Sequence, residues 1–117
     1  MPHATALDDQ SFKQTVEAGN GLTLVDFWAP WCAPCVFMSP IIDEAAAKHG
    51  EQLLVAKVNI DDSPETANRY NIRSIPTFVF FRDGAEIARH TGVLTRPLLD
   101  IMVQQHTSQA TPPATRA

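Results

Sequence analysis

The chain has 117 residues, of which 44% are hydrophobic and 19% charged, and its net charge is −4. This size and composition predict one globular domain and argue against a disordered chain. The absence of a basic run argues against nucleic acid or an anionic membrane as the main partner. The first residues, Met1–Thr5, lack the features of a signal peptide, and no apolar stretch reaches membrane-spanning length. A cytoplasmic protein is therefore expected, with a leader already removed as the alternative.

The predicted elements alternate between strands and helices along the chain. Apolar runs and capping, proline and glycine signals place a strand over 4–7, a helix over 8–17, a strand over 22–29, a helix over 32–50, a strand over 53–60, a short helix capped by Ser63, strands over 77–81 and 85–90 around the turn 82–84, and a helix over 95–106. A helix between two continuous apolar strands is the signature of a parallel pair. The order βαβαβαββα predicts an α/β fold, with a central mixed sheet flanked by helices on both faces.

These elements form a single predicted domain over 1–106. The segment 107–117 consists mainly of Thr, Ser, Gln, Pro and Ala and is expected to be a disordered tail without an assigned role. A monomer is expected because no extra apolar surface is evident, and a weak dimer through the site described below is the alternative. The apolar part of the last helix is expected to comprise Leu98, Leu99, Ile101, Met102 and Val103.

The only two cysteines, Cys32 and Cys35, are one helical turn apart, within bridging range of each other. A disulfide across so short a loop adds little stability, so electron exchange with other disulfides is the favoured interpretation. Cys32 lies at the predicted start of a helix, where free N–H groups and the helix dipole favour a thiolate, and Pro34 fits the first turn. The pattern predicts attack by Cys32 on a substrate disulfide, followed by attack of the deeper Cys35 on the mixed disulfide.

Two other interpretations of the cysteines stay open. A zinc site would need two further ligands, and the four histidines are scattered without ligand spacing. A structural disulfide or a pair of idle thiols is the second alternative. No metal and no cofactor is expected.

Asp26 is an acid inside the apolar run 22–29. An unpaired buried carboxylate holds its proton more tightly than usual, so Asp26 is a candidate proton acceptor and donor for Cys35. A polar group satisfied by hydrogen bonds is the alternative. Lys57 is the lone charge in the neighbouring apolar run and is a candidate partner that moderates the proton affinity of Asp26. A purely structural lysine with a buried stem is the alternative for Lys57.

The chain closely resembles the thioredoxin family over nearly the whole predicted domain. The resemblance rests on the segments 26–35, 57–61 and 75–77 and on Pro40, Gly84 and Gly92. It implies the thioredoxin fold and a protein disulfide reductase in which Cys32 is the nucleophile and Cys35 the resolving thiol. It also implies Asp26 as the proton-transfer carboxylate with Lys57 as its modulator. Reduction by a flavin-containing, NADPH-dependent thioredoxin reductase is implied by the resemblance alone.

The resemblance further implies a docking rim for disulfide-containing protein substrates. Pro76 matches the cis-proline that faces the dithiol in the family and leaves the backbone of Ile75 free to pair with an extended substrate segment. A side chain in place of Gly92 would obstruct close approach, and Trp28 would pack behind the dithiol. The implied apolar rim consists of Trp31, Ile75, Pro76, Gly92 and Val93.

Three positions depart from the common family pattern. Ala33 stands where glycine is usual, and since Ala33 and Pro34 separate the cysteines, the pair is expected to tune the reduction potential. Val36 replaces a frequent basic residue, and Ser74 replaces a frequent glycine. An oxidant or isomerase of the same fold and a non-catalytic binding module are the alternatives to a reductase.

Overall fold

The computed structural model describes residues 3–107, and its elements follow the predicted order. They are β1 (Thr5–Leu7), α1 (Asp9–Phe12), the π-helical segment η1 (Lys13–Glu17), β2 (Leu22–Trp28), α2 (Ala33–His49), β3 (Leu54–Asn59), α3 (Pro64–Arg69), β4 (Thr77–Arg82), β5 (Ala85–Thr91) and α4 (Arg96–Thr107). Among these residues, none of the helices has the length and apolar character that a membrane span requires.

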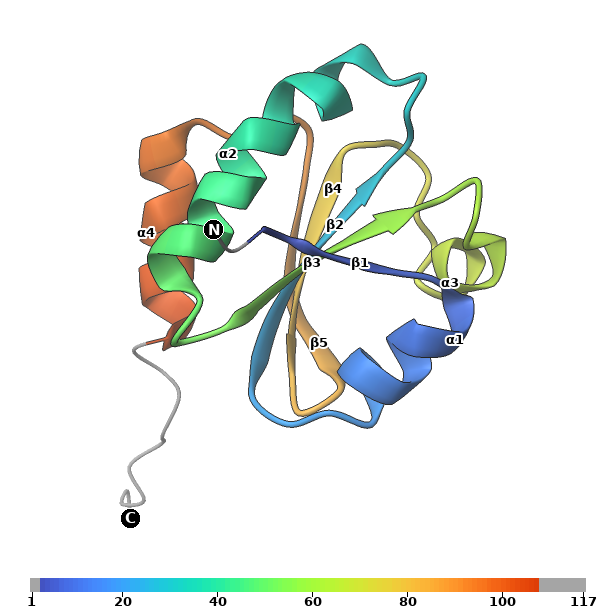
Figure 1. The fold of residues 1–117 in the computed structure, drawn as a ribbon, viewed down its shortest axis with the longest axis horizontal. Coiled ribbons are helices and arrows are strands. Elements are labelled where there is room, and N and C mark those ends of the chain that lie inside the picture. The colour runs from blue at the N-terminus through green and yellow to red at the C-terminus, as the bar shows by residue number, and fades with distance from the viewer. Residues whose placement is uncertain (1–2, 108–117) are drawn as a thin grey trace.

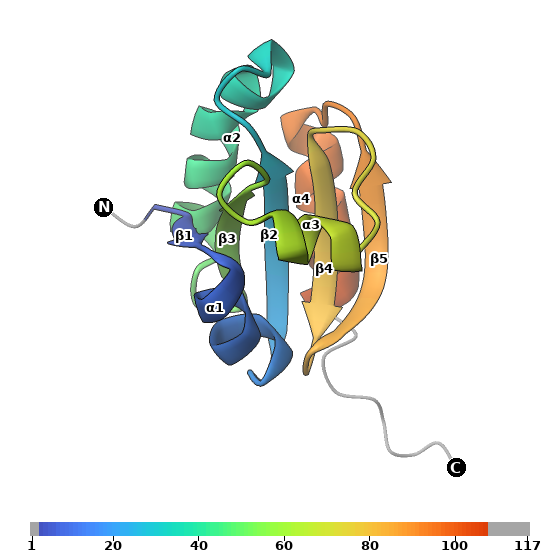
Figure 2. The same ribbon diagram turned by 90° about the vertical axis from the view of Figure 1, so that its right-hand side faces the viewer.

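The described strands form one five-stranded sheet in the order β1-β3-β2-β4-β5. Strand β3 runs parallel to β1 and β2, whereas β4 runs antiparallel to both β2 and β5, so the sheet is mixed as predicted. The sheet is seen with β2 between β3 and β4 in Figure 2. Strand β2 is therefore central, which explains why its residues from Leu22 to Phe27 are all buried.

Helices cover both faces of the sheet, which confirms the predicted layers. Figure 1 shows α2 and α4 on one side of the sheet and α1 and α3 on the other. The core on the α2 side includes Met38, Ile42, Phe78, Phe80, Leu99 and Val103. The core on the α1 side includes Phe12, Val16, Val25, Phe27, Val79 and Phe81. Each fully buried large apolar side chain contributes roughly 1.5–3 kcal/mol, so the two cores together hold the sheet between its helices.

The first helix is capped by Asp8. The Ser11 N–H donates to Asp8 Oδ1 at 2.8 Å, and the Asp8 N–H donates to Ser11 Oγ at 2.8 Å. The helix widens in its second half, where the Ala18 N–H donates to the Lys13 carbonyl five residues earlier at 2.9 Å. The helix still ends at Glu17, as predicted, but its last turns are π-helical.

The side chain that caps α3 is that of Asp9, which is far from α3 in the sequence, and not that of Ser63. Ser63 occupies the N-cap position, but its side chain makes no capping hydrogen bond, so the predicted role of that side chain is wrong. The Asp9 carboxylate instead accepts from the Thr66 N–H at 2.8 Å, from Thr66 Oγ1 at 2.6 Å and from the Glu65 N–H at 3.3 Å. A side chain of α1 thus satisfies the free N–H groups of α3.

The predicted hairpin joins β4 to β5. Asp83 and Gly84 both have positive φ, 52° and 89°, as a two-residue hairpin turn requires. A Cβ atom at Gly84 would lie 2.3 Å from the backbone oxygen of Glu17. Glycine is therefore needed both for the conformation of the turn and for its close approach to η1.

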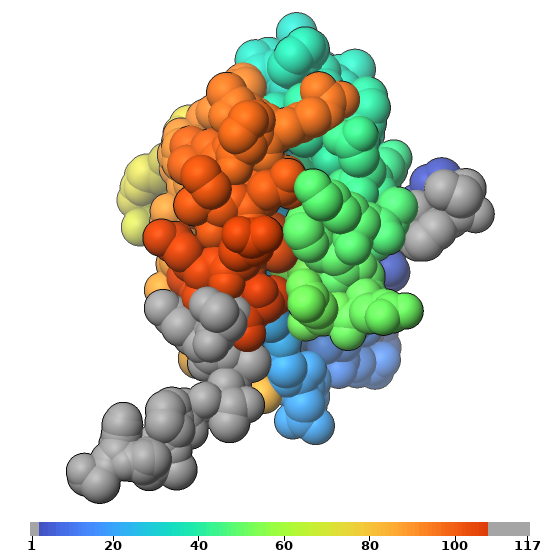
Figure 3. Space-filling model, turned by 90° about the vertical axis from the view of Figure 1, so that its left-hand side faces the viewer, coloured from blue at the N-terminus to red at the C-terminus, as the bar shows by residue number. Residues whose placement is uncertain are grey.

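Helix α4 lies beside α2, as Figure 3 shows from that side of the molecule. Of the apolar residues predicted for this helix, Leu99 and Val103 are buried, whereas Leu98 and Ile101 are 41% and 52% exposed. Val36 and Phe37 of α2 are also exposed, so the surface carries more apolar area than the sequence suggested. Helix α4 includes residue 107, one residue into the predicted tail, and 108–117 lie outside the described residues.

Candidate active site

The two cysteines lie where the chain leaves β2 and enters α2. Cys32 is the N-cap of α2 and is joined to Cys35 by a disulfide with a Cα–Cα distance of 5.2 Å. The Cys35 N–H points at Cys32 Sγ, with the nitrogen 3.2 Å from the sulfur. A sulfur at the N-terminus of a helix lies close to free backbone N–H groups and to the positive end of the helix dipole. Both favour a thiolate at Cys32 once the disulfide is reduced.

The two sulfurs differ in their surroundings. Cys35 is 1% exposed and Cys32 is 6% exposed, so Cys35 is the deeper residue, as predicted. Both belong to a small buried cluster with Ala29, against which Trp28 and Ile75 pack. The predicted position of Trp28 behind the dithiol is thus confirmed.

The loop before β4 lies against the dithiol. The peptide bond between Ile75 and Pro76 is cis. The Ile75 carbonyl oxygen is 3.9 Å from Cys32 Sγ, a contact and not a hydrogen bond, because a disulfide sulfur carries no proton. The Gly92 N–H donates to the Pro76 carbonyl at 2.8 Å and fixes this loop to the end of β5.

The predicted rim residues gather around the cysteines at different depths. Trp31 is 67% and Val93 is 49% exposed, whereas Ile75 is half-buried and Pro76 is buried. Trp31 Nε1–H donates to Asp61 Oδ2 at 3.0 Å, a contact that orients the exposed ring. Pro76 therefore supports the rim from below and contributes little surface of its own.

Gly92 occupies an open place on this rim. Its φ is +104°, and a Cβ atom built there meets no other atom within 4 Å. The backbone conformation requires glycine, while nothing within the described chain excludes a side chain. The predicted obstruction of an approaching partner at Gly92 stays a prediction.

A hollow of about 460 Å³ lies next to the dithiol. Sequence reasoning missed three of its lining residues, Ile60, Ile72 and Arg73, although the last two nearly adjoin the Ile75-Pro76 motif. Ala33 and Ser74, two of the departures from the family pattern, also line it. The hollow is lined by Trp31, Cys32, Ala33, Pro34, Ile60, Ile72, Arg73, Ser74 and Ile75.

Asp26 lies in the interior on β2. It is 1% exposed, and neither of its carboxyl oxygens has a hydrogen-bond partner. Burial raises the pKa of Asp26 from 3.8 to about 7, with Lys57 opposing the rise and Asp43 adding to it. Alternate strand residues share a face, so Asp26 faces α2 together with Leu24 of the α2-side core.

Lys57 lies beside Asp26 in the parallel register of β2 and β3. Its Nζ donates to Ser39 Oγ of α2 at 2.7 Å and lies 4.5 Å from the centre of the Trp28 ring. Lys57 lowers the pKa of Asp26 through space, and the carboxylate receives no hydrogen bond from it. Sequence reasoning missed Ser39, whose only signal is a hydroxyl one turn after Cys35.

The described residues offer no other evident centre for redox or metal chemistry. Within 3–107, no group of three or more His, Cys, Asp or Glu side chains is arranged to hold a metal ion. The fold and the disulfide at the N-terminus of α2 together define a thiol–disulfide oxidoreductase.

Comparison with known proteins identifies the family. A model of the thioredoxin family matches residues 3–105, and the chain belongs to this family. The chain is 42% identical over 106 residues to "Thioredoxin 1" of Synechococcus elongatus, an alignment that covers 91% of this chain and 99% of that protein. It is 39% identical over 106 residues to "Thioredoxin 1" of a Nostoc species, with the same coverage of 91% and 99%. It is 42% identical over 100 residues to "Thioredoxin" of Pyropia yezoensis, covering 86% and 94%.

Family membership and the Cys32–Cys35 pair establish the activity as that of a protein disulfide reductase.

Proposed function

We propose that Cys32 and Cys35 reduce protein disulfides in two successive exchanges. The Cys32 thiolate attacks one sulfur of the substrate disulfide, which breaks that bond, forms a mixed disulfide and releases the first substrate sulfur as a thiolate. Cys35, as a thiolate, then attacks Cys32 Sγ and releases the second substrate sulfur. Two electrons pass from the dithiol to the substrate, and the Cys32–Cys35 disulfide remains. The observation that carries this assignment is the N-cap position of the more exposed Cys32.

Asp26 is the group that accepts the proton of Cys35 before the second exchange. A proton acceptor works best when its pKa lies near the working pH, and the pKa of Asp26 is about 7. Its unpartnered oxygens leave it free to take the proton. Lys57 limits the rise of this pKa and so keeps part of the carboxyl population ionised at neutral pH.

The rim formed by Trp31, Ile75, Pro76, Gly92 and Val93 docks an extended segment of the substrate. The Ile75 backbone beside Cys32 pairs with that segment in the manner of an added strand, which brings the substrate sulfur to Cys32. The open space at Gly92 supports close approach there. Ala33 and Pro34, between the cysteines, tune the reduction potential.

The proposed electron donor is an NADPH-dependent thioredoxin reductase, and the proposed setting is a cytoplasmic monomer without nucleic acid or membrane partners. Family membership supports the donor and the cytoplasmic location. Coupled oxidation of NADPH by a thioredoxin reductase in the presence of the chain tests the donor. Sedimentation of the purified chain tests the monomer, since exposed apolar residues such as Phe37 leave a dimer as the contrary result.

The two cysteine variants test the order of attack on a peptide that contains one internal disulfide. We expect Cys32→Ser to reduce turnover to background and to form no adduct. We expect Cys35→Ser to accumulate a mixed disulfide with the peptide, visible as a mass increase that dithiothreitol removes. Accumulation of the adduct by Cys32→Ser, and not by Cys35→Ser, would overturn the assignment.

A further inference from the structure

The ammonium group of Lys57 is held by helix α2 and not by the neighbouring carboxylate. Its Nζ is 2.7 Å from Ser39 Oγ and 4.5 Å from the centre of the Trp28 ring. An ammonium has three N–H donors, and a carboxylate is its strongest acceptor in a protein. The ammonium of Lys57 therefore contacts a hydroxyl although a carboxylate, the stronger acceptor, lies on the neighbouring strand.

Asp26 is within reach of Lys57 by strand register. The two residues are directly paired between β2 and β3. Each follows a member of the α2-side core by two positions, Leu24 and Val55, so both side chains face α2. Even so, both oxygens of Asp26 are without a hydrogen-bond partner. A buried carboxyl and a lysine thus lie side by side without forming an ion pair.

We propose that Ser39 is a positioning residue that holds Lys57 away from Asp26, so that the carboxyl stays free to take and return the proton of Cys35. This inference rests on the role of Asp26 proposed above. Ser39 lies one helical turn beyond Cys35, where its hydroxyl meets the ammonium of Lys57 from above the sheet.

The charges around Asp26 determine what loss of the Ser39 hydroxyl does. Lys57 faces it from β3 and Asp43 acts on it from α2, which also carries Cys35. On the other side, β4 contributes the uncharged Phe78. Asp43 is itself occupied by the Ala4 N–H at 3.0 Å. Without the Ser39 hydroxyl, Asp26 is the nearby carboxylate with free oxygens, and the ammonium is expected to turn toward it.

The direct test is a pH titration of the Asp26 carboxyl carbon by NMR in the oxidised protein. We expect the midpoint in Ser39→Ala to fall by about one pH unit, the lower end of the effect of an opposite charge within ~4–6 Å. Ser39→Thr retains a hydroxyl and is expected to keep the original midpoint. An unchanged or raised midpoint in Ser39→Ala would overturn the inference.

A double-mutant cycle shows whether the effect passes through Lys57. In a protein that already carries Lys57→Met, adding Ser39→Ala is expected to leave the titration midpoint of Asp26 unchanged. The same fall without Lys57 would contradict the inference, because the hydroxyl would then act on Asp26 in another way.

The pH profile of the second exchange separates this inference from the proposed role of Asp26. If the pH profile of the second exchange in Ser39→Ala moves to lower pH together with the Asp26 titration, the role of Ser39 and the role of Asp26 are both supported. If the titration moves and the profile does not, Ser39 still positions Lys57, but Asp26 is not the proton acceptor. If the profile depends on Asp26 and the titration does not move, the role of Asp26 stands and that of Ser39 is lost.

Discussion

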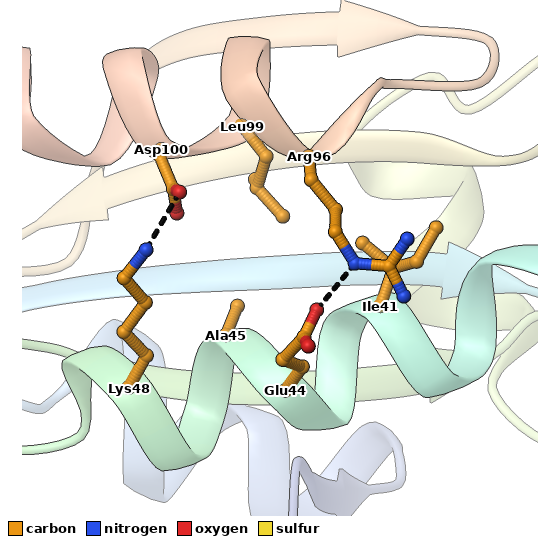
Figure 4. Close-up of a pocket in the computed structure, with 7 residues that line it drawn as sticks. All are labelled: Ile41, Glu44, Ala45, Lys48, Arg96, Leu99 and Asp100. Atoms are coloured by element: carbon orange, nitrogen blue, oxygen red, sulfur yellow. Dashed lines mark hydrogen bonds and ion pairs between the residues drawn. The ribbon is translucent and has the colours of Figure 1, made fainter.

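Two regions of the molecule place a lysine near an aspartate, with opposite results. At the interface of α2 and α4, Lys48 Nζ lies 2.8 Å from Asp100 Oδ2, and His49 Nε2 lies 3.0 Å from Asp100 Oδ1. Figure 4 shows the Lys48–Asp100 pair across a hollow of about 150 Å³. In the interior on β2, Lys57 and Asp26 are paired by register but not by a hydrogen bond.

The two aspartates differ in their exposure to solvent and in the hydrogen-bond donors that reach their carboxyl oxygens. Asp100 is 32% exposed, and hydrogen bonds from Lys48 and then His49 lower its pKa. Asp26 has lost its water without gaining a donor, and burial raises its pKa to about 7. An ion pair near the surface contributes little and serves the packing of two helices. An unpaired buried acid costs stability, and a site that retains one is a candidate for proton transfer.

The largest expected effect is on stability, from Asp26→Asn in the oxidised protein. The folded pKa of about 7 lies above the ordinary value of 3.8, so the folded state binds more protons between these limits. Stability therefore falls as pH rises through this window. We expect Asp26→Asn to nearly match the parent protein at about pH 4 and to exceed its unfolding free energy by about 4 kcal/mol at about pH 8.5. Urea unfolding at both pH values measures this difference.

A constant difference between the two proteins at both pH values would contradict that expectation. It would mean that Asp26 titrates alike in the folded and unfolded chains. Glu86, whose pKa is lowered by the hydrogen bond from Arg89, provides a control, because Glu86→Gln should not reproduce the effect.

A smaller effect is expected from Lys57→Met on the proton affinity of Asp26. Lys57 opposes the rise in the pKa of Asp26, so its removal is expected to raise that pKa further, by about one unit. NMR titration of the carboxyl measures the shift. An unchanged midpoint would contradict the role of Lys57 as the residue that limits the pKa of Asp26.

The smallest effect is expected at the other region, from Asp100→Asn. The pKa of Asp100 is lowered in the folded chain, so its contribution is present above the ordinary value of 3.8 and is lost as pH falls through the folded pKa. Because the pair is partly exposed, we expect a loss of less than ~1 kcal/mol near pH 7, reduced further by salt. Disulfide reductase activity should be unchanged, and a loss of activity would mean that this interface also serves the site.

Much of the site follows from the sequence because its signals are local. The spacing of Cys32 and Cys35, the helix start between them and the acid within the apolar run 22–29 each lie in one short segment. The pairing of Lys57 with Asp26 follows from two apolar runs joined by a helix, which fixes a parallel pair. The mixed sheet with helices on both faces follows from the same alternation of elements.

Other features depend on how a helix rotates over the sheet or meets a distant side chain. The contact of Ser39 with Lys57 spans 18 residues, and the cap that Asp9 supplies to Thr66 spans 57. Local sequence patterns do not predict either contact. A hydroxyl or a carboxylate accepts a hydrogen bond from whichever donor the packing of the fold places beside it. Residue type alone also does not separate Leu98 from Leu99, of which the first is exposed and the second is buried on α4.

The most direct test of the account is the rate of the second exchange as a function of pH. A mixed disulfide on Cys32 is formed rapidly with excess peptide, and release of the second peptide thiol is followed in a single turnover. We expect an inflection near pH 7, where Asp26 titrates, and in Asp26→Asn a rate lower by about 100-fold without that inflection. An identical rate and inflection in Asp26→Asn would contradict the claim that the buried carboxyl takes the proton of Cys35.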